Sequence, residues 1–182
     1  MNMKYMAQVK LGNKKIGILG GTFDPAHYGH VVISKLAKKK YKLNKIIWAI
    51  TNQNPFKKKT ITSIQDRIKL AKKINIKNKF IKIRNYEKKI KSNRTIDLLK
   101  FLKKQNNNTK IFFIIGADSL INFHKWNKFE KIIKLCKIIV FDRSGYKKKA
   151  LKSLAFRKYG NKNIEFINFN KVNISSSKLR KI

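Results

Sequence analysis

Two histidines three residues apart, His27 and His30, are the residues of this 182-residue chain whose type and spacing best suit chemistry. They close the string GGTFDPAHYGH at 20–30, and a helical pattern of apolar residues begins directly after them. Both imidazoles therefore belong to the first turn of a helix, on one side of it, where they can contact the same anion. A helix N-terminus adds free amides and a favourable dipole. The pattern predicts a phosphate-binding site that includes two histidines.

A short apolar run that includes Ile16, Ile18 and Leu19 precedes the histidine string and predicts a buried strand. Gly20 and Gly21 are expected to turn the backbone and to let it approach a ligand closely, because neither residue has a Cβ atom. A strand, a glycine turn and a helix N-terminus in this order form the phosphate-binding unit of parallel α/β proteins. The chain has neither the GxGxxG fingerprint nor the Gly-Lys-Ser/Thr of a P-loop.

Apolar and amphipathic segments alternate along the rest of the chain. Strands are expected at 14–19, 45–51, 80–83, 111–115, 137–141 and 164–169, and helices from about 29 onward and at about 64–74, 95–102, 129–135 and 147–159. This alternation predicts an α/β fold, a single domain with a Rossmann-like, doubly wound parallel sheet. The domain is expected to cover 14–182, and 1–13 is expected to be a flexible N-terminal leader.

A second group of phosphate-binding side chains stands near the carboxyl end, in the string ISSSKLR at 174–180. Ser175 is a good helix N-cap, Ser176 would lie in the first turn with an unpaired amide, and Arg180 follows about one turn later. Hydroxyls, amides and a guanidinium together suit a polyphosphate. Alone, the string is more typical of a capped helix end; beside the histidine string it favours a second part of one phosphate site.

The string GGTFDPAHYGH resembles the GxFDPxHxGH motif of the nucleotidylyltransferase superfamily and, in detail, that of bacterial nicotinate-nucleotide adenylyltransferases. ISSSKLR is similar to the ISSTxIR motif of the same family, with Ser177 in the place of Thr. The resemblance implies catalytic roles for His27, His30 and Arg180. It implies ATP-binding roles for Gly20, Gly21, Thr22, Phe23, Lys57, Ser175 and Ser176.

Blocks between these motifs resemble the part of the family that binds the mononucleotide. SNRTIDLL is similar to the family's xxYTxDTL, which implies that Thr95 helps to hold the nicotinate carboxylate; plain helix capping is its alternative role. GADSLINFHKW resembles GADxxxxxxxW, which implies that Asp118 lies near the nucleotide sugar and the metal, and that Trp126 stacks on the pyridinium ring. An indole face attracts such a cationic ring. Trp48, inside an apolar strand, is expected in the core, and Arg143 either faces the nucleotide or caps a strand end.

The resemblance implies transfer of AMP from ATP to nicotinate mononucleotide with Mg²⁺, which gives deamido-NAD and pyrophosphate in NAD biosynthesis. A phosphate oxygen of the mononucleotide attacks the α-phosphorus directly, so no protein nucleophile is needed and positioning supplies the catalysis. We assign no metal-ligating residues. Phosphopantetheine adenylyltransferase or cytidylyltransferase activity is the alternative within the superfamily, and the blocks around Thr95 and Trp126 speak against it.

The charge of the chain suggests an alternative of another class, a basic nucleic-acid-binding protein. Lys and Arg number 46 against 8 Asp and Glu, a formal net charge of +38. Most of these cations are lysines spread over the whole chain, whereas specific phosphate recognition tends to use arginine, so we expect no specific nucleic-acid partner. Cys136 is the single cysteine and excludes an intrachain disulfide; its apolar run predicts a buried, inert thiol. With no signal peptide and no apolar run of membrane-spanning length, a cytoplasmic protein is expected, and no oligomeric state is predicted.

Overall fold

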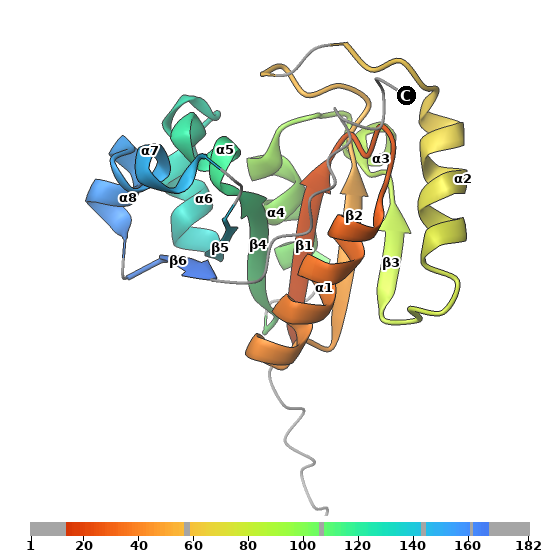
Figure 1. Ribbon diagram of the computed structural model, residues 1–182, viewed down its shortest axis with the longest axis horizontal. Coiled ribbons are helices and arrows are strands. Elements are labelled where there is room, and N and C mark those ends of the chain that lie inside the picture. The colour runs from red at the N-terminus through yellow and green to blue at the C-terminus, as the bar shows by residue number, and fades with distance from the viewer. Residues whose placement is uncertain (1–13, 57–58, 106–107, 143–144, 161, 168–182) are drawn as a thin grey trace, which may run out of the picture.

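The computed structural model describes residues 14–56, 59–105, 108–142, 145–160 and 162–167. Six strands form one sheet in the order β3-β2-β1-β4-β5-β6, and every neighbouring pair is parallel (Figure 1). The strands are β1 (Lys15–Gly21), β2 (Lys45–Ile50), β3 (Ile81–Arg84), β4 (Lys110–Gly116), β5 (Lys137–Phe141) and β6 (Ile164–Ile167). The predicted α/β fold with a Rossmann-like parallel sheet is confirmed.

Helices cover both faces of the sheet, as a sheet of parallel strands requires. They are α1 (Tyr28–Tyr41), α2 (Ile64–Ile74), α3 (Glu87–Ile90), α4 (Thr95–Gln105), α5 (Ala117–Ile121), the 3₁₀ helix η1 (Phe123–Lys125), α6 (Phe129–Leu135), α7 (Lys147–Leu151) and α8 (Leu154–Tyr159). α1, in front of the sheet in Figure 1, and α2 pack on one face around Trp48, whereas α4 to α8 pack on the other face around Phe113. Side chains that alternate along each strand supply both cores.

Gly20 and Gly21 do not form the expected turn. They are the last two residues of β1, paired with Ala49 and Ile50 of β2. A Cβ atom at Gly20 would make a tight contact, 3.3 Å from the Phe113 ring. The backbone turns instead at Phe23, which adopts the left-handed conformation (φ 50°). The prediction of a glycine turn was wrong because both residues continue the parallel pairing of β1 with β2.

Short helices account for most other differences from the expected elements. α3, α5 and η1 have 4, 5 and 3 residues, too few to show a helical period in the sequence. The helix expected at 147–159 is two helices, since Ser153 starts α8 by accepting a hydrogen bond from the backbone of Phe156. The strand expected at 164–169 is described as far as Ile167.

The order of the strands fixes where a ligand can bind. After β3 at one edge, the chain returns to the other side of β1 and adds β4, β5 and β6 in that direction. Connections from β1 and β4 therefore run to opposite sides, and open parallel sheets bind ligands at the carboxyl ends of such strands. The histidine string follows β1, and Asp118 follows β4, so the two segments that carry the described nucleotide candidates start side by side.

Candidate functional site

His27 and His30 lie against each other at the carboxyl end of β1. His27 is the N-cap of α1, in an extended conformation (φ −146°, ψ 169°), and His30 is in the first turn. Their ring centroids are 3.8 Å apart with an angle of 35° between the ring planes. The backbone N–H of His27 donates to Nδ1 of His30 over 3.2 Å, and the backbone N–H of His30 donates to the carbonyl of His27 over 3.0 Å. The predicted placement of both imidazoles on one side of the helix is confirmed.

The hydrogen bond to Nδ1 determines which atom of His30 can donate to a ligand. A neutral imidazole has one N–H and one acceptor nitrogen. Since Nδ1 of His30 accepts from His27, its proton is on Nε2 in the neutral ring. Nε2 is therefore the atom of His30 that can donate to a phosphate oxygen.

A group of buried side chains supports His30 from beneath. The ring of Phe23 lies 4.7 Å from that of His30 and stacks on Trp48 at 4.9 Å, centroid to centroid. The indole N–H of Trp48 donates to the hydroxyl of Ser34 (2.9 Å), which donates to the backbone carbonyl of His30 (2.7 Å). Trp48, Ser34 and Phe23 are buried, so Trp48 is a core residue as predicted and Phe23 has only its backbone to offer a nucleotide. Ser34 was missed because its buried partner is remote in sequence.

On the other side of β1, Asp118 and Trp126 lie in the segment that follows β4. Asp118 is in the first turn of α5, and its carboxylate folds back over Gly116, where a Cβ atom would collide with it. Trp126 ends η1 and is half-buried, with its ring edge-on to Phe123 at 5.1 Å and to Phe113 at 6.1 Å. Both aromatic neighbours belong to the core packed under α5 and α6, so they fix the orientation of the indole.

A second aromatic ring faces Trp126 from the loop that follows β2. Phe56 is 48% exposed, and its ring is almost parallel to that of Trp126, with 6° between the planes and 6.5 Å between the centroids. The sequence analysis did not single out this exposed phenylalanine, which lies against a residue predicted to bind the mononucleotide. The signal available was its place in a turn-rich loop directly after a buried strand.

Two adjoining hollows of about 690 and 650 Å³ open beside the N-terminus of α4 and share Lys91, Ser92 and Asn93. The smaller hollow also reaches the loop after β2, and neither is lined by His27 or His30. Thr95 is the first residue of α4 but lines neither hollow.

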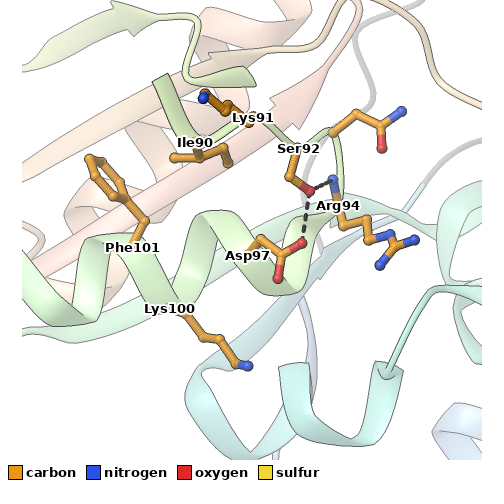
Figure 2. Close-up of a pocket in the computed structure, with 8 residues that line it drawn as sticks. Ile90, Lys91, Ser92, Arg94, Asp97, Lys100 and Phe101 are labelled. Atoms are coloured by element: carbon orange, nitrogen blue, oxygen red, sulfur yellow. Dashed lines mark hydrogen bonds between the residues drawn. The ribbon is translucent and has the colours of Figure 1, made fainter. Parts of the chain in front are cut away.

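Ser92 organises the start of α4. Its hydroxyl donates to the carboxylate of Asp97 over 2.7 Å and accepts from the backbone N–H of Arg94 over 3.2 Å (Figure 2). These bonds form a local turn ahead of the helix and tie it to Asp97 in the first turn. In Figure 2 the cationic side chains of Lys91 and Lys100 lie on different sides of the larger hollow.

Several predicted site residues lie outside the described residues: Lys57, Arg143, Ser175, Ser176 and Arg180. The approach of Arg180 to the two histidines therefore stays a prediction. Within the described part of the chain, no three His, Cys, Asp or Glu residues are grouped so that they could hold a metal ion, and no helix is long and apolar enough to cross a bilayer. Cys136 is buried, as predicted, and burial raises the pKa of its thiol to about 12.

Comparisons with known proteins agree with this geometry. The cytidylyltransferase-like family model matches residues 18–182. The chain is 60% identical over 168 residues to a probable nicotinate-nucleotide adenylyltransferase of Pelagibacter ubique (strain HTCC1062), which covers 92% of this chain and 93% of that protein. It is 32% identical over 164 residues to a probable nicotinate-nucleotide adenylyltransferase of Aquifex aeolicus (strain VF5), which covers 88% of this chain and 98% of that protein.

A solved structure has the same fold. It is the nicotinic acid mononucleotide adenylyltransferase of Plasmodium falciparum complexed with NaAD, which superposes with a TM-score of 0.73 at 26% identity and covers 92% of this chain and 83% of that one. The paired imidazoles at the carboxyl end of β1, the strand order and these similarities over nearly the whole length lead to one conclusion. The chain belongs to the nicotinate-nucleotide adenylyltransferase family of the nucleotidylyltransferases.

Proposed function

We propose that this protein transfers AMP from ATP to nicotinate mononucleotide and so forms deamido-NAD and pyrophosphate. The observation that carries the proposal is the pair of imidazoles, 3.8 Å apart between centroids, directly after the central strand of a chain 60% identical to a probable member of this family. The solved relatives from Plasmodium falciparum, complexed with NaAD and with APC, support a nucleotide site of this kind. The transferase domain is proposed to span 14–182.

The proposed reaction is a direct displacement at phosphorus. A 5′-phosphate oxygen of the mononucleotide forms a bond to the α-phosphorus of ATP, the bond from that phosphorus to the bridging oxygen breaks, and pyrophosphate leaves with the electron pair. The protein aligns the two phosphates and stabilises the charge that develops on them. Nε2 of His30 and the imidazole of His27 are proposed to donate to the transferring phosphate, because the bond to Nδ1 leaves Nε2 as the proton-bearing atom of a neutral His30.

The remaining phosphate contacts are proposed from the sequence motifs. The backbone of Gly20–Phe23 would contact ATP, and Lys57 would reach its phosphates. Ser175, Ser176 and Arg180 would hold the pyrophosphate as it leaves, since a guanidinium and hydroxyls suit its negative charge. Mg²⁺ would enter with the phosphates of ATP and offset their charge. Asp118 offers the oxygen ligand that this ion prefers, at the carboxyl end of β4.

On the acceptor side, we propose that Trp126 stacks on the pyridinium ring, Asp118 contacts the sugar and Thr95 contacts the nicotinate carboxylate. The core contacts of Trp126 support its role, because an indole held by Phe123 and Phe113 loses little freedom when a ligand stacks on it. The role of Thr95 is proposed from the sequence motif, because Thr95 starts α4 but is not among the residues that line either hollow there.

The test is a comparison of acceptors and nucleotides in one assay. Pyrophosphate release is measured with nicotinate mononucleotide, nicotinamide mononucleotide, phosphopantetheine and no acceptor, each with ATP and with CTP, since the matching family model is described as cytidylyltransferase-like. We expect ATP with nicotinate mononucleotide to react fastest, with loss of activity in EDTA and recovery with Mg²⁺. Faster release with phosphopantetheine or with CTP would instead support the alternative activities.

A further inference from the structure

Arg67 on α2 is a buried charge that the proposed reaction does not use. The residue is 2% exposed, and its side chain donates to four backbone carbonyls, three of them in the segments that follow β1 and β2. Its Nη1 donates to Thr22 over 2.7 Å and to Thr51 over 2.8 Å. Its Nη2 donates to Asn52 and its Nε to Thr62, each over 3.0 Å.

Two carboxylates bind the same segments from other sides. Asp24 is fully buried and accepts from the backbone N–H groups of Ile61 (2.8 Å) and Thr62 (3.3 Å). Glu87 on α3 accepts from the hydroxyl of Thr51 and from the backbone N–H of Asn52, the latter over 3.1 Å. We call Asp24, Arg67 and Glu87 the loop brace. Burial lowers the pKa of Arg67 while the negative charges of Asp24 and Glu87 raise it.

Of the joined segments, one is assigned to ATP by the proposed function, and the other carries a ring that faces the proposed acceptor side. Thr22 is in the predicted ATP-binding stretch that follows β1. Thr51 and Asn52 start the loop that carries Phe56, whose ring is parallel to that of Trp126 on the acceptor side. One guanidinium therefore fixes the distance between a backbone segment proposed for ATP and a loop that faces the proposed mononucleotide site.

Burying a guanidinium is costly, and an apolar side chain could fill the space under these loops with no charge to desolvate. What an apolar residue cannot do is hold several carbonyls at fixed directions, because only the planar fork of arginine has five N–H donors in rigid geometry. Lysine has three donors on a single atom at the end of a flexible stem. The arrangement therefore indicates that the relative positions of these four backbone carbonyls matter, and not only the filling of the space beneath the loops.

We propose that Arg67 is a positioning residue for adenylyl transfer, which holds the ATP-binding backbone and the loop after β2 at the spacing that aligns the two phosphates. This inference rests on the proposed function. A displacement of about 1 Å between reacting groups costs on the order of 100-fold in rate. Each substrate keeps most of its own contacts when the loops shift, so the change should appear in kcat and much less in KM.

The test compares Arg67→Met, Arg67→Lys and a control at the C-cap of the same helix, Asn75→Ala. Asn75 is also buried and also donates to a backbone carbonyl, that of Ala71 over 2.9 Å, but at the other end of α2. We expect kcat per folded molecule to fall at least tenfold in Arg67→Met, with the KM for each substrate within about threefold of the wild-type value. Arg67→Lys should recover part of the lost Tm but little of the kcat, and Asn75→Ala should lower the Tm with kcat unchanged.

Hydrogen–deuterium exchange provides a readout that needs no turnover. Amides at 20–26 and 50–56 should exchange faster in both Arg67 variants than in the wild type and in Asn75→Ala. All kinetics are measured well below each Tm, and Arg67→Lys serves if Arg67→Met does not fold. Unchanged exchange in these peptides, or an Arg67 variant with kcat within twofold of that of Asn75→Ala, would overturn the proposal. A wild-type enzyme without activity on nicotinate mononucleotide would instead overturn the proposed function. The exchange comparison would still decide whether Arg67 of the loop brace holds the two loops in place.

Discussion

His30 offers a sharp test of the proposed mechanism, because its two ring nitrogens have separable tasks. Nδ1 accepts from the backbone of His27, and Nε2 is proposed to donate to phosphate. His30→Asn places an amide oxygen near the position of Nδ1 and removes the donor at Nε2. His30→Gln places an amide donor near the position of Nε2, and His30→Ala removes both groups.

The expected loss of kcat in the His30 variants is much larger than the expected loss of the free energy of unfolding. Loss of one donor that stabilises transition-state charge costs about 100- to 1,000-fold in kcat. The hydrogen bond from His27 is worth about 0.5–1.5 kcal/mol, and the ring contact with Phe23, 4.7 Å between centroids, a similar amount. His30→Ala should therefore lose roughly 1–3 kcal/mol of the free energy of unfolding, or about 2–12 °C in Tm for a chain of this size.

The two measurements should rank the variants differently. Pyrophosphate release at saturating ATP and nicotinate mononucleotide gives kcat, and thermal unfolding followed by circular dichroism gives Tm. We expect His30→Gln to keep the most turnover, with His30→Asn and His30→Ala lowest and about equal. We expect His30→Asn to unfold at a higher temperature than His30→Ala. A kcat of His30→Asn within twofold of the wild-type value would remove Nε2 from the mechanism.

Three further predictions concern other parts of the molecule. Trp126→Ala should raise the KM for nicotinate mononucleotide by about 2- to 30-fold, because a cation–π contact contributes roughly 0.5–2 kcal/mol, and should leave the KM for ATP within twofold. Equal increases in the two KM values would argue against stacking. Because burial raises the pKa of Cys136 to about 12, a disulfide reagent at pH 8 should label the thiol in urea but not in the native protein, and immediate native labelling would contradict this. Burial alone would raise the pKa of Glu165, but hydrogen bonds from Lys137 and Lys40 lower it to about 2. Its folded pKa lies below the unfolded value, so the ionised Glu165 stabilises the protein above about pH 4.5 and this stabilisation is lost as the pH falls toward 2. In urea unfolding, the free energy of unfolding of Glu165→Gln should therefore fall less between pH 4.5 and pH 2 than that of the wild type, by less than about 1 kcal/mol because the side chain is one-third exposed. An equal fall in both proteins would refute this.

The order of strands and helices could be predicted from the sequence because the longer elements show the hydrophobic period of a helix or a strand. The helix expected at 129–135 and the strand expected at 137–141 have those bounds in the structure, and the helix expected at 95–102 buries Ile96, Leu99 and Leu102 at helical spacing. The histidine pair was also predictable, since its geometry depends on neighbours within one helical turn.

What the sequence could not show are interactions that depend on contacts between distant segments. Arg67 lies in an amphipathic helix and has the residue type that usually faces solvent, so its burial is visible only when the loops after β1 and β2 are placed around it. Ser34 is similar, because its partner Trp48 belongs to the next strand. Phe56 gave no periodic signal, and its meaning depends on Trp126, far along the chain.

The two tryptophans of the sequence report on opposite sides of the sheet. The indole of Trp48 is buried 5.7 Å from the His30 ring, whereas that of Trp126 is half-buried on the side that we assign to the acceptor. Replacing either one by phenylalanine leaves a single tryptophan, which can be excited selectively over the six tyrosines, and the pair of variants separates the emission changes caused by each substrate. Stopped-flow traces of the two variants would then give the order in which the substrates bind, without any attached dye.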